Sequence, residues 1–316
     1  MTRSSSSFFT DLDGVEAALE GHCRPELVVI GQGQFRARLI QINLARLSLL
    51  NAEEWQSRVL FLRPPADRLV ILLPWDSEPC QSWAGMALGA QEILTVRAVP
   101  GVHARTVGHC HSAAIFCSTD YLVRVGRRLI GPQFVVPPGV VRWQPAPDSL
   151  KALTALFRAA IRVTGSRLSA PTSPEAARGL EQEVLGALAE CLSTAPARRG
   201  ERHRMQISVM ARFAEILGLH AERRPSLADL SRELGVSSRT LRTYCRDHLG
   251  VAPGHYLRFY KLHQFHRELQ HADPSVTTLS ALALRHGIRQ SGRLGRFYRE
   301  LFGEPPSATL RRVGDT

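Results

Sequence analysis

The sequence predicts an α+β protein, with a β-rich N-terminal part, a helical segment after it and an all-α C-terminal part. Short β-prone runs separated by Gly, Pro and Asn fill most of the first 147 residues. After them, apolar residues recur at the spacing that is typical of helices. The formal net charge of +12 is unevenly distributed along the chain. Residues 201–316 hold 19 Lys and Arg against 11 Asp and Glu (+8), and residues 1–200 hold 21 against 17 (+4). The cationic excess therefore lies mainly in the helical part.

The N-terminal part, residues 1–147, is predicted to be an antiparallel β-sandwich or small barrel. Many short strands with turn residues between them are typical of these all-β architectures. The β-prone runs are 27–30, 34–50 with a break inside, 58–62, 68–73, 92–98 and 113–117. A small barrel can enclose one ligand, so an effector is expected to bind here. The serine-rich residues 1–10 are expected to form a loose arm.

Helices are expected in residues 148–193. Apolar residues recur there at intervals of three and four, first over 150–161 and again over 180–192. Such a segment either packs on its own domain or forms a dimer interface. Residues 194–204, which are rich in arginine, are predicted to be a linker, and 205–316 a second domain that begins with a helix.

A helix-turn-helix signal begins at Ser226. This residue and Asp229 fit a capping box at the start of a helix over 227–234, and Gly235 ends that helix. A second helix, over about 238–248, follows at once. Only three residues separate the two helices, which is the spacing of the helix-turn-helix motif.

The second helix of this unit has an apolar back and a cationic front. At 100° per residue, Leu241, Cys245 and Leu249 share one face. Guanidinium groups on the other face can form bidentate hydrogen bonds with phosphates or with guanine edges in a major groove. For one such helix alone, a solvated basic face is the alternative interpretation. The residues of this unit expected to contact DNA are Ser238, Arg239, Arg242, Thr243 and Arg246.

A second unit repeats this plan. Thr277 or Thr278 caps a helix over 279–285, Gly287 provides the turn, and a second recognition helix is expected over 290–302. Gly inside a helix costs about 1 kcal/mol relative to Ala, so the first unit is expected to contribute more specificity. The residues of this unit expected to contact DNA are Arg289, Gln290, Gly292, Arg293 and Arg296.

A longer helix over 253–270 joins the two units. Its large apolar residues do not keep to one stripe, so it is predicted to pack on several sides and to join the units rigidly. At 1.5 Å per residue it would be about 27 Å long, comparable with the ~34 Å between successive major-groove turns. The two recognition helices could therefore enter successive turns on one face of a duplex.

Four segments of this part carry a family resemblance. They are Gly-Val-Ser-Ser-Arg-Thr-Leu at 235–241, the segment 249–258, Leu-Ala at 282–283 with Gly287, and Leu-Phe-Gly-Glu-Pro-Pro-Ser at 301–307. Together they resemble the DNA-binding domain of the AraC family of bacterial transcription regulators. The segment after residue 291 looks more like the ethanolamine-utilisation regulators of that family. The chain departs from the family pattern at Thr243, Cys245, Ile288, Gly292, Arg293 and Leu294.

The resemblance implies a DNA-binding transcription regulator controlled by a small molecule. In this family the N-terminal domain is a cupin-like sensor that binds the effector, and the helices after it mediate homodimer formation. The implied partners are double-stranded promoter DNA, an effector, a second copy of the chain and, for an activator, RNA polymerase. The identity of the effector and the choice between activation and repression stay open here, as does an architectural DNA-binding protein without an effector.

Aromatic and polar residues near predicted strand ends are candidates for effector contact. They are Trp75, Trp83, His103, Arg105, His109 and His111. His109 and His111 would share one face of a strand and could bind a metal ion with His103, but the sequence places no carboxylate beside them. No metal, no cofactor and no enzymatic activity is therefore predicted. The alternative is a cupin-type metal-binding enzyme or metal sensor fused to a DNA-binding tail.

Other sequence features favour a cytoplasmic protein without membrane contact. No apolar run approaches the ~18 residues of a membrane span, and residues 1–10 lack the apolar core of a signal peptide. The basic residues lie on short capped helices, whereas membrane-surface helices are long and amphipathic. The six cysteines form no Cys-x-x-Cys pair and are expected to be reduced, with a thiol redox sensor as the alternative.

Overall fold

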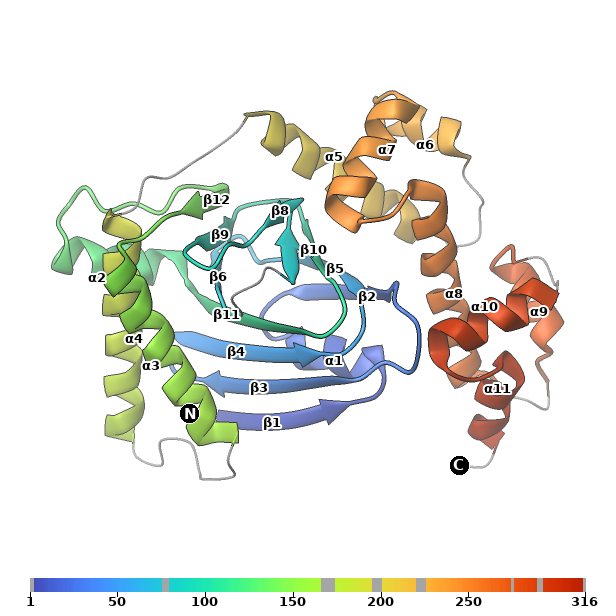
Figure 1. Cartoon of the computed structure of the whole chain (residues 1–316), viewed down its shortest axis with the longest axis horizontal. Coiled ribbons are helices and arrows are strands. Elements are labelled where there is room, and N and C mark those ends of the chain that lie inside the picture. Colours follow the sequence, from blue (N-terminus) through green and yellow to red (C-terminus); the bar gives the residue numbers. More distant parts are fainter. Residues whose placement is uncertain are drawn as a thin grey trace.

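The computed structural model describes residues 3–75, 80–165, 174–194, 201–219, 226–273, 276–288 and 292–314. It confirms the predicted α+β fold class. Two antiparallel sheets form the N-terminal part, helices α3 and α4 lie along one side of it, and the C-terminal helices form a separate column on the opposite side (Figure 1). The C-terminal helices are therefore placed to contact the sheets directly.

The two sheets have seven and five strands. The seven-stranded sheet has the order β1-β3-β4-β11-β6-β9-β12, and the five-stranded sheet the order β2-β5-β10-β7-β8. The strands are β1 (Arg3–Phe9), β2 (Arg24–Val29), β3 (Ala37–Asn43), β4 (Leu47–Glu54), β5 (Arg58–Arg63), β6 (Arg68–Leu73), β7 (Gln81–Trp83), β8 (Met86–Ala87), β9 (Ile93–Arg97), β10 (Val102–Thr106), β11 (Cys110–Ser118) and β12 (Gly139–Trp143). All strand pairs in both sheets are antiparallel.

The central strands of the larger sheet are buried on both faces. On one face, Leu72 and Phe116 pack with the five-stranded sheet, and on the other, Ile71 and Ile115 pack with the helices. Continuous apolar runs are typical of strands buried on both faces, which is why these strands were the easiest to predict from sequence. Each helix or sheet layer thus removes one apolar face from water.

The helices of the N-terminal half are α1 (Leu12–Leu19), α2 (Thr119–Leu129), α3 (Pro147–Gly165) and α4 (Pro174–Thr194). The apolar sides of α2, α3 and α4 share one core cluster with the outer face of the seven-stranded sheet. The expected helices of residues 148–193 therefore pack on their own domain. Their predicted role as a dimer interface stays a proposal.

The expectation of a loose N-terminal arm was wrong. Residues Arg3–Phe9 form β1, which pairs along its whole length with β3 at the edge of the seven-stranded sheet. An edge strand needs only backbone pairing along one side, so four consecutive serines, Ser4 to Ser7, do not prevent it. The short strands β7, β8, β10 and β12 and the helices α1 and α2 also lay outside the predicted runs.

Two of the six cysteines are paired, contrary to the expectation that all are reduced. Cys80 and Cys110 form a disulfide that ties the segment before β7 to the first residue of β11. The other four, Cys23, Cys117, Cys191 and Cys245, are buried thiols, and burial raises the pKa of each to about 12. A thiolate is the reactive form, so these four are poor candidates for a redox sensor.

Replacing both bonded cysteines by Ser is expected to lower the free energy of unfolding by about 2 to 4 kcal/mol. The bond closes a loop with a sequence separation of 30 residues, and the unbonded chain regains the entropy of that loop when it unfolds. Urea unfolding of the wild type with and without a thiol reductant, beside the double variant, measures the effect. Equal stability of oxidised wild type and variant would show that the bond contributes nothing.

The C-terminal half is all helical. Its helices are α5 (Glu201–Leu219), α6 (Leu227–Leu234), α7 (Ser238–Leu249), α8 (Pro253–His271), α9 (Leu279–Arg285), α10 (Gly292–Phe302) and α11 (Pro306–Gly314). Residues 201–204, expected in the linker, belong to the first turn of α5, and 195–200 lie outside the described residues. Within the described parts of the chain, no helix combines the length and the hydropathy that a membrane crossing requires.

Candidate nucleic-acid interface

The first helix-turn-helix unit consists of α6 and α7. Ser226 and Asp229 form the predicted capping box, in which each side chain bonds the backbone N–H of the other residue. Gly235 adopts φ +67°, a left-handed conformation that glycine tolerates without steric cost, and so ends α6. The Ser237 hydroxyl then accepts a bond from Thr240 N–H and starts α7. Local chemistry therefore fixes both helix ends at the turn.

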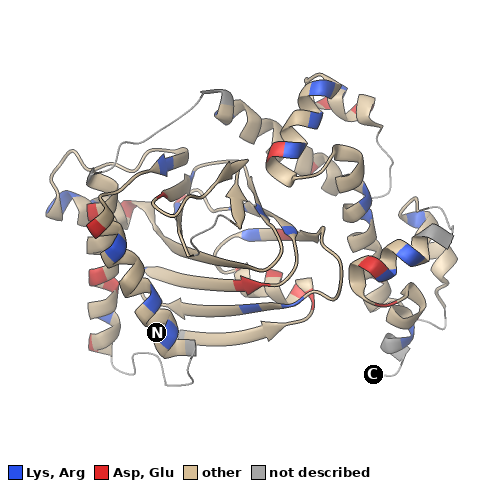
Figure 2. Ribbon diagram, in the orientation of Figure 1, with Lys and Arg blue, Asp and Glu red and all other residues tan. Residues whose placement is uncertain are grey.

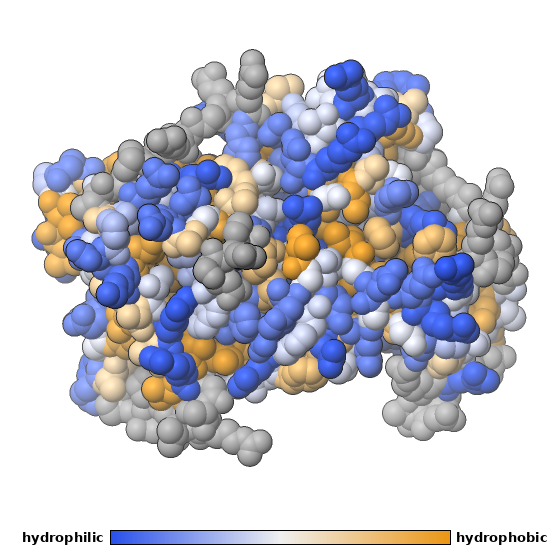
Figure 3. Space-filling model, in the orientation of Figure 1, coloured by the Kyte–Doolittle hydropathy of each residue, from blue (hydrophilic) through white to orange (hydrophobic). Residues whose placement is uncertain are grey.

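Helix α7 presents a buried back and an exposed cationic front. Leu241, Cys245 and Leu249 are fully buried in a cluster with α5, α6 and α8. Arg239, Arg242 and Arg246 are exposed on the opposite side, and none of the three forms an ion pair with another described residue. Lys and Arg gather on α7 in Figure 2, and Figure 3 shows a hydrophilic surface over this unit. Three guanidinium groups are thus available to an anionic surface.

The two hydroxyl residues predicted to contact DNA from α7 are already engaged. The Ser238 hydroxyl lies 3.0 Å from the Ser231 hydroxyl and so links α7 to α6 across the turn. The Thr243 hydroxyl donates to the Arg239 carbonyl 3.2 Å away, inside its own helix. Thr243 is exposed and can still offer its methyl group and its lone pairs, whereas Ser238 is partly covered.

Helix α8 connects the two units as predicted. It has Pro253 in its first turn, where the missing N–H does no harm, and 19 residues, which gives a length of about 28 Å. Tyr256, Leu262 and Phe265 are buried although they point in different directions. They pack into different core clusters, so α8 is held from several sides. In Figure 1, α8 runs between the α6–α7 pair and the α9–α10 pair.

The second unit consists of α9 and α10. Thr278 caps α9, and Gly287 makes the turn with φ +60°. Helix α10 begins at Gly292, so this glycine stands at the helix start and not within it. The destabilisation of about 1 kcal/mol expected for an internal Gly does not apply to residue 292, but it does apply to Gly295.

Only part of the predicted DNA contacts of the second unit can be located. Arg289 and Gln290 lie outside the described residues, as does the side chain of Arg293, and Gly292 has no side chain. Arg296 is exposed, and its Nε lies 2.8 Å from Glu300 Oε1 one turn away. Such an exposed ion pair is weak, and the smaller contribution expected from this unit stays a prediction.

The C-terminal helices are attached to the β-sheets through α8. The Arg267 guanidinium reaches Asp13 Oδ1 at 2.9 Å and Glu16 Oε1 at 2.6 Å on α1. On the same helix, His263 Nε2 donates to the Val29 carbonyl of β2 at 2.9 Å. His263 is buried, and the loss of hydration lowers its pKa to about 3. The imidazole is therefore neutral in the folded protein, and its contact with β2 depends on that state.

A second buried attachment joins the end of α7 to β10. His103 of β10 and His248 of α7 are both buried, with ring centres 6.4 Å apart. Burial lowers the pKa of His248 to about 3 and that of His103 well below its usual value. Arg105, also on β10, lies against Gly250, where an added Cβ would meet its guanidinium group. The C-terminal end of α7 thus packs against the five-stranded sheet.

The six predicted effector residues do not form one site. His103 and Arg105 belong to the β10–α7 contact, and Trp83 is buried in the core between the sheets, where its Nε1 donates to Gln81. Trp75, His109 and His111 do come together, at one end of the seven-stranded sheet. His103 is therefore not the third imidazole of a metal site. The carboxylate of Glu53 lies beside His109 and His111 instead, a neighbour that only strand pairing reveals.

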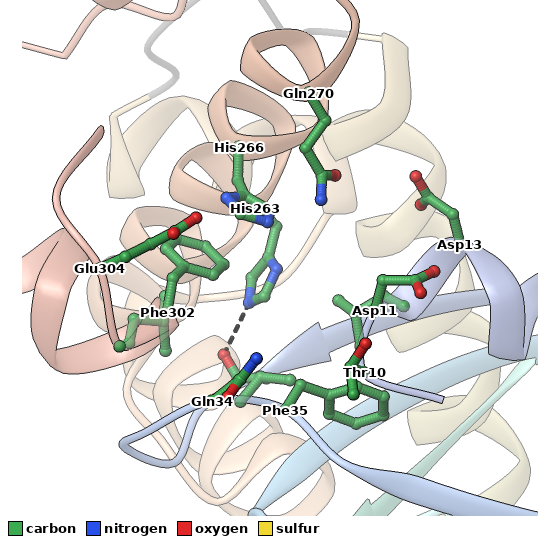
Figure 4. A pocket seen from close by; sticks show the side chains of 14 residues that line it. Thr10, Asp11, Asp13, Gln34, Phe35, His263, His266, Gln270, Phe302 and Glu304 are labelled. Carbon is green, nitrogen blue, oxygen red and sulfur yellow. Dashed lines mark hydrogen bonds between the residues drawn. The ribbon is translucent and has the colours of Figure 1, made fainter. Parts of the chain in front are cut away.

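A cavity of about 400 Å³ lies between the N-terminal half on one side and α8 and the end of α10 on the other. In Figure 4, His263, His266 and Gln270 of α8 face Thr10, Asp11 and Asp13 across it. Asp11, Asp13 and Glu304 supply carboxylates, and no Lys or Arg is among its described lining residues. This cavity could not be predicted from sequence, because its two walls come from opposite ends of the chain.

Comparison with known proteins identifies the C-terminal helices. Residues 230–312 match a family model described as a helix-turn-helix domain. The chain carries an AraC-type helix-turn-helix domain. The XylDLEGF operon transcriptional activator 1 of Pseudomonas putida is 34% identical over 101 residues, which are 32% of this chain and 30% of that protein. The probable thc operon regulatory protein of Rhodococcus erythropolis is 31% identical over 99 residues, 31% of this chain and 30% of that protein.

The AraC-type domain accounts for the shared sequence, since the chain spans about a third of the length of these curated relatives. Among solved structures, the AraC-like transcriptional activator CuxR aligns with 84% of this chain and 96% of its own, at 14% identity and a TM-score of 0.44. The predicted AraC-type DNA-binding domain is confirmed for residues 230–312. The likeness to the ethanolamine-utilisation subgroup stays a prediction.

Proposed function

We propose that this protein is a sequence-specific DNA-binding transcription regulator controlled by a small-molecule effector. The observation that carries the proposal is the cationic front of α7, held on a buried back within an AraC-type domain. Its arginines would contact major-groove edges and phosphates of promoter DNA. The protein would act in the cytoplasm as a homodimer, without enzymatic activity, and with RNA polymerase as a partner if it activates.

Selection from a random duplex library tests this function. The full chain is expected to enrich one defined sequence and to bind it at least about a thousandfold more tightly than a scrambled duplex of equal length. Arg242→Ala is expected to cost about 1 to 3 kcal/mol and to relax preference at one base position if Arg242 reads a base. Equal affinity for selected and scrambled duplexes would favour an architectural protein.

We infer that the effector binds in the cavity between the two halves. Its walls belong to the sensor half and to the helices that carry the second unit, so a bound molecule would change how firmly the halves hold together. Three carboxylates, of which that of Asp13 already pairs with Arg267, line it together with amide, imidazole and threonine hydroxyl groups. These groups favour a small cation with hydrogen-bonding groups, such as a hydroxylated amine.

Asp11→Asn tests this assignment. Asp11 Oδ1 accepts a bond from Gly14 N–H at the start of α1, and Asn keeps that cap while it removes the charge. A primary amine that raises the melting temperature of the full chain is expected to bind the variant about tenfold more weakly, since one charge-assisted bond is lost. Asp120→Asn, in the first turn of α2, is the matched control. Equal amine binding by all three proteins would place the effector elsewhere.

A further inference from the structure

The two histidines at the end of the seven-stranded sheet have a carboxylate between them. Glu53 lies directly opposite His111 in the pairing of β4 with β11, and His109 precedes β11 by one residue. His109 Nε2 is 3.1 Å from Glu53 Oε1, and His111 Nε2 is 3.7 Å from the same oxygen. One ligand atom from each of the three residues lies within 4.8 Å of the others.

These separations fit ligands of one metal ion. Two ligands that each bind Zn²⁺ at 2.0 to 2.1 Å in tetrahedral geometry are about 3.3 Å apart. The two measured distances lie on either side of this value. Two imidazole nitrogens and one carboxylate oxygen are a ligand set used by zinc and by other first-row divalent ions. Small rotations of the side chains would bring all three within bonding distance of a common point.

The surroundings hold the three ligands in place while leaving the site open. The Trp55 ring stacks on His109 with centres 5.6 Å apart, and the Trp75 ring stacks on His111 at 6.2 Å. Cys110 stands between the two histidines in the sequence, so its side chain lies on the opposite face of β11, where it is bonded to Cys80. The side chains of His109, His111 and Glu53 are 51%, 26% and 24% exposed, so an ion can enter from solvent.

We propose that Glu53, His109 and His111 form a binding site for a divalent transition-metal ion, Zn²⁺ by preference. The ion would cross-link β4 to β11 and keep at least one coordination position for water or an external ligand. The site lies in the sensor half, apart from the residues that line the cavity between the halves. It is therefore independent of the proposed effector site, and a failed amine experiment would not affect it.

Equilibrium dialysis of the full chain against Zn²⁺ tests the site. One equivalent is expected to bind, and Co²⁺ in its place is expected to give the visible absorption of a four- or five-coordinate ion. His109→Ala, His111→Ala and Glu53→Gln are each expected to weaken binding at least about tenfold. The double variant His255→Ala/His271→Ala, which removes two exposed histidines of α8, is expected to bind like the wild type.

The fold of each variant is checked by thermal unfolding without metal. The three ligands are partly exposed, so their substitution is expected to leave the metal-free melting temperature within about 2 °C of the wild type. The melting temperature with Zn²⁺ should rise for the wild type and for the α8 control only. Binding that the three variants leave unchanged, or the absence of a bound equivalent in the wild type, would overturn the proposal.

Discussion

Replacing Arg239, Arg242 and Arg246 together by Ala is expected to weaken binding to the selected duplex by at least about a hundredfold. Each guanidinium that reads a base contributes about 1 to 3 kcal/mol, and each that contacts a phosphate lowers the salt dependence of binding by about one unit when it is removed. The three side chains are exposed while the back of α7 is buried, so the variant is expected to fold. Affinity is measured by fluorescence anisotropy at several salt concentrations.

A matched variant controls for the loss of three positive charges. Helix α2, in the N-terminal half, has three exposed arginines, Arg124, Arg127 and Arg128. Their replacement by Ala changes the net charge by the same amount. This control is expected to weaken binding less than about threefold, through long-range electrostatics alone. If both triple variants lose affinity equally, the basic charge acts without a defined contact surface, and α7 is not the recognition helix.

Acidification is expected to lower the free energy of unfolding by several kcal/mol between pH 6.5 and pH 4. His248 and His263 have pKa values lowered by burial to about 3, against about 6.5 in the unfolded chain. The unfolded state therefore binds more protons in this range, and stability falls as pH falls. The loss is on the order of 3 kcal/mol for each of the two at pH 4. Well above pH 6.5 both imidazoles are neutral in the folded and in the unfolded state, and this loss of stability disappears.

Other buried groups change this profile in known directions. Burial also lowers the pKa of His22, His103 and His203, so these three add to the loss at low pH. Glu16 acts in the opposite sense, because burial raises its pKa more than Arg267 lowers it. The gain in stability from one carboxyl group is smaller than the loss from five imidazoles. The net effect is a loss of stability on acidification.

Urea unfolding at a series of pH values measures this effect. His263→Gln removes one buried imidazole and can still donate to the Val29 carbonyl, so its stability is expected to depend less steeply on pH than that of the wild type. His255→Gln, at an exposed position of the same helix, is expected to follow the wild-type profile. Stability that is constant from pH 7 to pH 4 would show that these histidines are not buried in a neutral form.

Helices α6, α7 and α8 could be predicted to within one residue because their signals are local. The capping box at Ser226, the left-handed Gly235 and Pro253 at a helix start each act within one turn of the chain. The apolar back of α7 follows from helical periodicity alone, and the structure buries it as expected. The central β-strands were predicted for a similar reason, since their apolar runs are continuous.

What the sequence could not supply are contacts between distant segments. Glu53 is more than 50 residues from His109, and only the β4–β11 register brings them together. His103 was grouped with His109 by sequence proximity, but β10 and β11 belong to different sheets, so the two side chains point to different places. The β1 strand escaped prediction because its partner β3, and not its own composition, makes it a strand.

A hydroxyl-radical footprint of the full chain on its selected duplex tests the central claim most directly. Two recognition helices joined by α8 are expected to protect two segments on one face of the duplex, with centres about 10 base pairs apart. The Arg239, Arg242 and Arg246 triple variant should lose the segment contacted by α7. Uniform cleavage along the duplex, or protection that the triple variant leaves intact, would contradict the assignment of α7 as the recognition helix that supplies most of the specificity.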